Sequence, residues 1–179
     1  MNGFEALIAE LLCDEGYWIR SSVKVALTKD DKRAIGRPSS PRWEIDLVAY
    51  HAPENRVMAV ECKSYLDNPG VNLADIQGGR YASRYKLFTE PVVREVVLSR
   101  LASDLVSDGF CSPDPAVSLA LAVGRLRSDP DTTRAHFDEN GWVLLDPQWI
   151  HERLNAVSDG GYTDSIAAMV AKVLLRAPI

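Results

Sequence analysis

The chain has 179 residues, of which 46% are hydrophobic and 25% charged, the balance of one globular domain with a sizeable core. No apolar run is long enough to cross a bilayer, and the first residues show no basic region or signal core, so we expect a cytoplasmic protein without a membrane anchor. The net charge of −5 counts against a nonspecific coat of nucleic acid, because phosphate binding needs a basic face.

The cysteines and histidines are too scattered to form a recognisable metal site. No two cysteines form a CxxC pair, so they predict reduced, mostly buried thiols and neither a disulfide framework nor a zinc site. The residues concerned are Cys13, Cys62, Cys111, His51, His136 and His151.

The first third of the chain predicts a helix, a strand and a loop. Apolar residues recur at helical spacing over 3–15, and Gly16 is a suitable stop. Residues 17–27 alternate as a strand does, and the polar stretch 28–41, with one glycine and two prolines, predicts a loop.

Two apolar runs, 43–50 and 57–65, flank a short break and predict a β-hairpin. Each run carries charge where a buried strand normally has none, and such charge is costly unless it is paired or bound to a metal. Because side chains alternate along a strand, every second residue of each strand is expected to share one face. The residues that share a face are Glu44, Asp46, Val48 and Tyr50 on the first strand, and Glu61 and Lys63, opposite Val60 and Cys62, on the second.

The spacing Asp46, then Glu61-Cys62-Lys63, resembles the PD-(D/E)xK nuclease superfamily, in which one strand carries an acid and the next carries Glu-x-Lys. The resemblance implies an α/β fold with a restriction-endonuclease-like core: a helix, a three-stranded antiparallel meander, a helix and a parallel strand. A structural ion-pair cluster in an unrelated α/β protein is the other interpretation of the same charges.

Two further elements resemble members of this superfamily. In Holliday-junction resolvases and Mrr-like enzymes a Glu lies near the start of the first helix, and Glu5 has that position here, with Glu10 as the competing candidate. Residues 71–88 predict a helix in which Gln77 and Tyr81, four residues apart, share one face and resemble the Gln-x-x-x-Tyr element of RecB-type nucleases.

The rest of the chain predicts alternating helices and strands. We expect helices over 90–105, 133–140 and 148–157, a buried parallel strand over 116–123, a short strand over 142–145 and a last helix ending at Arg176. Ile166, Met169, Val170, Val173 and Leu174 form the apolar face of that last helix. The expected organisation is a single domain, 1–179, with a nuclease-like core over 4–123 and a C-terminal strand and helical extension over 124–179.

The resemblance implies a divalent-metal-dependent nuclease acting on DNA, with Mg²⁺ or Mn²⁺ as cofactor. It also implies a homodimer, since many members dimerise. The alternative is a catalytically weak or inactive module of the same fold that binds nucleic acid or a protein. The implied catalytic residues are Asp46, Glu61, Lys63 and Glu5; the metal ligands are Asp46, Glu61, the Cys62 carbonyl and Glu5, directly or through water; the substrate-binding residues are Gln77, Tyr81, Arg80 and Arg84.

Overall fold

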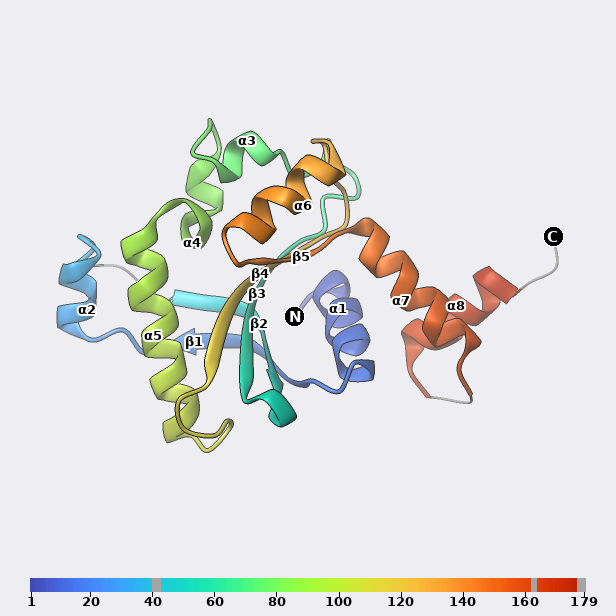
Figure 1. Cartoon of the computed structure of the whole chain (residues 1–179), viewed down its shortest axis with the longest axis horizontal. Coiled ribbons are helices and arrows are strands. Elements are labelled where there is room, and N and C mark those ends of the chain that lie inside the picture. Colours follow the sequence, from blue (N-terminus) through green and yellow to red (C-terminus); the bar gives the residue numbers. More distant parts are fainter. Residues whose placement is uncertain (40–42, 162–163, 177–179) are drawn as a thin grey trace.

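A five-stranded mixed sheet with the strand order β1-β2-β3-β4-β5 forms the centre of the computed structural model (Figure 1), which describes residues 1–39, 43–161 and 164–176. Strands β1 (Trp18–Val25), β2 (Trp43–His51) and β3 (Arg56–Lys63) form an antiparallel meander. Strands β4 (Ala116–Val123) and β5 (Val143–Leu145) follow in parallel beside β3. The predicted meander and the parallel strand after it are confirmed.

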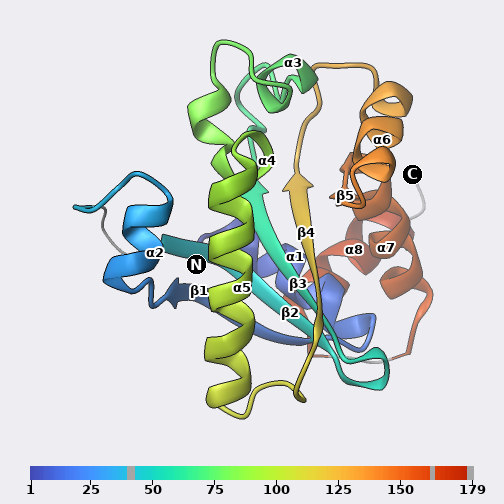
Figure 2. The same cartoon turned by 60° about the vertical axis from the view of Figure 1, so that its left-hand side comes forward.

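Helices cover both faces of this sheet and divide its apolar side chains between two cores. On one face lie α1 (Gly3–Asp14) and α7 (Pro147–Asp159), and on the other lies α5 (Pro91–Ser107) (Figure 2). The α1 core includes Ile8, Leu11, Leu47, Val60, Cys62, Ala120 and Ile150. The α5 core includes Ile45, Val48, Val57, Ala59, Val97, Leu101, Leu119 and Leu121. Because β4 supplies both cores, its sequence is a continuous apolar run.

The predicted loop over 28–41 contains a short helix, α2 (Lys29–Ala34). Thr28 and Asp31 form a capping box: the Thr28 hydroxyl accepts from the Asp31 N–H, and the Asp31 carboxylate accepts from the Thr28 N–H. Arg100 of α5 also bonds Asp31, at 3.0 Å between Nε and Oδ2. The loop prediction was therefore wrong for 29–34, and residues 40 and 41 lie outside the described part.

The predicted helix over 71–88 was also wrong, because the segment folds as three short pieces. These are α3 (Leu73–Ile76), the 3₁₀ turn η2 (Ala82–Arg84) and α4 (Lys86–Thr89). Gly78 has a φ of +96°, a left-handed conformation that ends α3. A Cβ on Gly79 would lie only 2.5 Å from the Ala74 carbonyl oxygen, so the chain turns sharply where only glycine fits.

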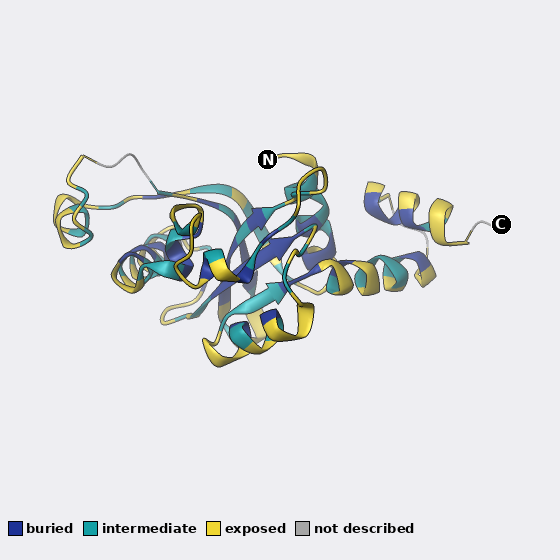
Figure 3. Cartoon of the chain, turned by 90° about the horizontal axis from the view of Figure 1, so that it is seen from above, coloured by how far each residue is buried: buried dark blue, intermediate teal, exposed yellow. Residues whose placement is uncertain are grey.

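The C-terminal extension places α6 (Pro130–Glu139) on the α5 side, where Phe137 joins that core. The last helix, α8 (Ile166–Arg176), packs against α7 through its small residues Ala167, Ala168 and Ala171. Its larger apolar side chains, such as Ile166 and Val173, remain exposed, and Figure 3 shows exposed positions along this helix. Among the described helices, none combines the length and apolar character required to span a bilayer.

Candidate functional site

Strands β2 and β3 separate at the residues that the sequence singles out. Their pairing ends at Leu47 and Val60. Beyond that point β2 stays paired with β1 as far as Trp43, while β3 stays paired with β4 as far as Lys63. The two strands therefore form a fork, and Asp46 and Glu61 are the first residues on its two arms.

The Asp46 side chain bridges this fork. Its Oδ2 accepts a hydrogen bond of 2.7 Å from the backbone N–H of Cys62. Here a carboxylate takes the place of the main-chain acceptor that a continuous ladder would supply, so the N–H is satisfied although the strands have parted. A hydrogen bond from an N–H to a charged acceptor is also among the stronger ones in proteins.

The alternation of side chains is interrupted at Asp46. Ile45 and Val48 both lie in the α5 core, although they are three residues apart and regular alternation would put them on opposite faces. Across the ladder from Asp46, Ser22 has a left-handed φ of 51° and the pairing skips both residues. Regular alternation therefore does not hold across Asp46, so the predicted common face of Glu44, Asp46 and Val48 is interrupted there. The distortion turns the Asp46 carboxylate toward β3.

Glu61 and Lys63 form an ion pair on the β3 arm. The Lys63 Nζ lies 3.4 Å from the Glu61 Oε2, and their side chains are 21% and 19% exposed. Burial raises the pKa of Glu61, the Lys63 ammonium counteracts this, and the negative charge of Asp46 adds to it. The three predicted residues are thus brought close enough to interact, and the half-buried Glu61 carboxylate has its charge only partly compensated.

The backbone of Cys62 faces the fork, whereas its thiol does not. In an extended strand the N–H and C=O of one residue point to the same side, and those of the next residue point to the other. The Lys63 carbonyl accepts from Gly124 beyond β4, and the Cys62 N–H bonds Asp46, so the Cys62 carbonyl is directed toward β2. The thiol lies in the α1 core, where burial and then the nearby Asp46 and Glu5 charges raise its pKa.

The predicted third carboxylate, Glu5, is engaged at the start of its own helix. One oxygen accepts from the Asn2 backbone N–H at 3.0 Å, and the other accepts from the Asn2 side-chain amide at 2.6 Å. These contacts complete a capping box with Asn2 as the N-cap. Glu5 is close enough to influence the Cys62 pKa, but both of its oxygens already have partners.

The competing candidate, Glu10, is committed elsewhere. Its Oε2 accepts from the Ser165 hydroxyl at 2.6 Å and from the Ala167 N–H at 3.0 Å, which ties α1 to the start of α8. Within the described ranges, no group of three or more His, Cys, Asp or Glu side chains is arranged to hold a metal ion. The carboxylates available at the fork are therefore Asp46 and Glu61, with the Cys62 carbonyl as a third oxygen.

The predicted substrate-binding residues lie apart from the fork, beyond the carboxyl ends of β3 and β4. Gln77 is the C-cap of α3, and its Nε2 lies 3.4 Å from the His136 Nδ1. Tyr81 follows the two glycines and its backbone N–H bonds the Asp75 carboxylate, so Gln77 and Tyr81 do not share a helical face. Arg80 and Arg84 keep their guanidinium carbons 5.4 and 4.7 Å from the centre of the Tyr81 ring.

Two residues that the sequence analysis did not select, Tyr65 and Arg127, join this second region. Both follow the carboxyl ends of neighbouring parallel strands, β3 and β4, and with Tyr81 and Arg84 they line a pocket of about 270 Å³. Ligands of α/β sheets commonly bind outside the carboxyl ends of the strands. The buried parallel strand predicted over 116–123 was a sequence signal that could have led to Arg127, and its pairing with β3 is what the structure adds.

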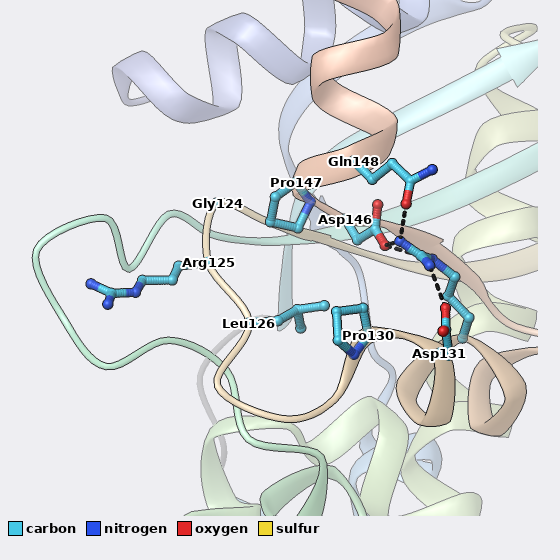
Figure 4. A pocket seen from close by; sticks show the side chains of 9 residues that line it. Gly124, Arg125, Leu126, Pro130, Asp131, Asp146, Pro147 and Gln148 are labelled. Carbon is cyan, nitrogen blue, oxygen red and sulfur yellow. Dashed lines mark hydrogen bonds and ion pairs between the residues drawn. The ribbon is translucent and has the colours of Figure 1, made fainter.

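A larger pocket, of about 580 Å³, lies between the loop after β4 and the start of α7 (Figure 4). Arg125 and Arg134 both line this pocket, and Arg134 is held by protein partners: it bonds Asp146 at 2.8 Å, Asp131 at 2.8 Å and Gln148 at 2.8 Å. Asp146 is buried and also caps α7 by accepting from the Trp149 N–H. This network fastens α6 to α7 and engages Arg134 with partners from the protein.

Comparisons with protein-family models, with curated proteins and with solved structures found no match to this chain, so the site is interpreted from its own geometry.

Proposed function

We propose that this protein is a divalent-metal-dependent nuclease that hydrolyses phosphodiester bonds of DNA, with its active site at the fork between β2 and β3. The observation that carries the proposal is the fork itself, where Asp46, Glu61, Lys63 and the Cys62 backbone converge. A restriction-endonuclease-like core is the proposed fold type, supported by the order of α1, the antiparallel meander, α5 and the parallel β4.

The oxygens at the fork fit a hard divalent cation. Carboxylate and carbonyl oxygens are the ligands that Mg²⁺ and Mn²⁺ prefer, and both ions retain waters beside one or two protein carboxylates. Asp46, Glu61 and the Cys62 carbonyl would hold the ion. The raised pKa of Glu61 supports this assignment, because a half-buried carboxylate with one ion-pair partner at 3.4 Å gains from a second positive charge.

A bound ion would supply an activated water and relief of negative charge at the phosphate. Each residue then has a separate task. Asp46, fixed by the Cys62 N–H, orients one ligand oxygen. Lys63 leaves Glu61 for the phosphate oxygens, or acts as a base toward the attacking water. Glu5 contributes negative charge from α1 without a free oxygen for direct coordination.

The test is Mg²⁺- or Mn²⁺-dependent cleavage of a mixture of linear, nicked, single-stranded and branched DNA. Lys63→Ala should abolish cleavage while the protein remains folded. Lys24→Ala is the matched control, because Lys24 is an exposed lysine on β1 of the same sheet. The proposed role of the fork would be ruled out if Lys63→Ala cleaved DNA as well as the wild type. It would also be ruled out if Lys63→Ala and Lys24→Ala lost cleavage equally.

The second candidate function is a module of this fold that binds nucleic acid or a protein without cutting. It is favoured by the engagement of Glu5 in its capping box, which leaves two side-chain carboxylates at the fork. This candidate predicts no cleavage with either metal ion and DNA binding that Lys63→Ala and Asp46→Asn leave intact. Sedimentation analysis at several concentrations tests the homodimer that the family resemblance implies.

A further inference from the structure

The pocket beyond the carboxyl ends of β3 and β4 has walls from three separate segments. They are the loop after β3, the turn between α3 and α4, and the loop after β4, and Figure 2 shows α3 above the arrowheads of both strands. The volume is about 270 Å³. The residues that matter for its chemistry are Tyr65, Asn72, Tyr81, Arg84, Tyr85 and Arg127.

These walls are held by a continuous set of hydrogen bonds, so the pocket is formed before any ligand binds. Val71 pairs with the loop after β4 through two backbone bonds, from its N–H to the Arg125 carbonyl at 2.9 Å and from the Arg127 N–H to its own carbonyl at 2.8 Å. Ser128 adds two more, bonding the Asn72 side chain at 3.0 Å and accepting from the Leu73 N–H at 2.7 Å. The side chain of Arg127 is thereby presented from a fixed backbone.

The pocket carries positive charge that the protein does not neutralise. Neither Arg84 nor Arg127 forms an ion pair with a carboxylate within the described part of the chain, whereas Arg134 nearby is fully paired. The carboxylate of Asp75 also lines the pocket and accepts from the Tyr81 N–H at 3.0 Å, so one acid lies beside two guanidinium groups and the balance stays positive. Two unpaired guanidinium groups in one concave site are suited to a phosphate, which arginine binds with paired N–H donors.

The pocket also offers an aromatic surface. Tyr81 is 42% exposed and is held beside the guanidinium groups of Arg80 and Arg84, while Tyr85 is buried beneath. Unstacked nucleobases bind to proteins by stacking on aromatic rings and on arginine planes. Tyr65 and Tyr85 both contact the α5 core, the side of the sheet that Glu61 and Lys63 face by strand alternation, and Tyr65 follows Lys63 by two residues.

We propose that this pocket binds a single unpaired nucleotide of DNA, with its phosphate on Arg84 and Arg127 and its base against Tyr81. A base stacked inside a duplex cannot enter a pocket of about 270 Å³, so binding requires a single strand, an overhang or a frayed end. The inference rests on the proposed nuclease function: it restricts the substrate to DNA that carries an unpaired nucleotide.

The test is DNA binding in the presence of EDTA, which separates the pocket from cleavage. The probes are a fluorescent single strand of about ten nucleotides and a blunt hairpin duplex, compared by fluorescence anisotropy. We expect the wild type to bind the single strand more tightly than the duplex. Arg127→Ala and Tyr81→Leu should each weaken single-strand binding about tenfold or more.

Arg125→Ala is the matched control, because Arg125 lies on the same loop as Arg127 but lines the neighbouring pocket. Its binding should stay close to that of the wild type. Equal weakening in Arg125→Ala and Arg127→Ala, or equal affinity for the single strand and the blunt duplex, would overturn the pocket assignment. If Arg127→Ala alone loses single-strand binding and the wild type cleaves no DNA, the result would support the nucleotide pocket and contradict the proposed nuclease function.

Discussion

Replacing Asp46 in two ways separates its structural contact from its charge. Asp46→Ala removes the acceptor for the Cys62 N–H in a half-buried fork, and leaving such a donor unsatisfied costs about 1.5–3 kcal/mol when the lost partner is charged. Asp46→Asn keeps an oxygen that can accept the same bond and removes the charge that opposes ionisation of Glu61. Its cost to the free energy of unfolding should stay below about 1 kcal/mol.

The assay is urea unfolding of the metal-free protein at neutral pH, with thermal unfolding as a second measurement. For a chain of this length, the loss in Asp46→Ala corresponds to a decrease of about 3–12 °C in Tm. Glu44→Ala is the control, since Glu44 is an exposed acid on the same strand. Both Asp46 variants should lose metal-dependent cleavage and the stabilisation that added Mg²⁺ confers. Equal destabilisation by the Ala and Asn substitutions would refute the proposed role of the Cys62 hydrogen bond.

Three other carboxylates give predictions. Because burial raises the pKa of Glu61, this group favours the metal-free fold at low pH and opposes it as pH rises through that pKa. Glu61→Gln should therefore have a higher free energy of unfolding than the wild type at neutral pH, and this difference should disappear in acid. A difference that does not change with pH in urea unfolding would contradict the prediction. Glu5→Gln preserves the capping box and should reduce cleavage by no more than about tenfold in a rate assay. Glu10→Ala should increase amide hydrogen exchange in α8 but not in α5, because it removes the hydrogen bonds that connect α1 to the start of α8. Unchanged exchange in α8 would contradict this role of Glu10.

The periodic elements were predictable from the sequence because local patterns determine them. The alternating hairpin, the continuous apolar run of β4 and the spaced apolar residues of α1 each reflect which side chains meet a core. The short α2 was not predicted although Thr28-x-x-Asp31 is a capping-box pattern, because a polar segment with one glycine and two prolines is more typical of a loop. The helix predicted over 71–88 failed at Gly78 and Gly79, whose backbone conformations no periodicity reveals.

The candidate site was predictable in its residues and less so in its geometry. Asp46, Glu61 and Lys63 do approach one another, as the spacing indicated. The fork depends on β1 holding one strand and β4 holding the other, and Ser22 and Leu121 are distant from Asp46 in sequence. Glu5 matched the local pattern better than Glu10, whose spacing to Gly16 fits less well, and their partners distinguish their roles: Asn2 for Glu5 and the start of α8 for Glu10.

The contact between Asp46 and position 62 uses the main chain, and this has a consequence for how the site can vary. Every amino acid except proline supplies the same N–H and C=O, so the chemistry of the thiol is not what the contact requires. Position 62 is limited instead by volume, because its side chain fills part of the α1 core. A search for distant relatives should accordingly leave this position open to small and medium apolar residues and reject only proline and bulky or charged ones.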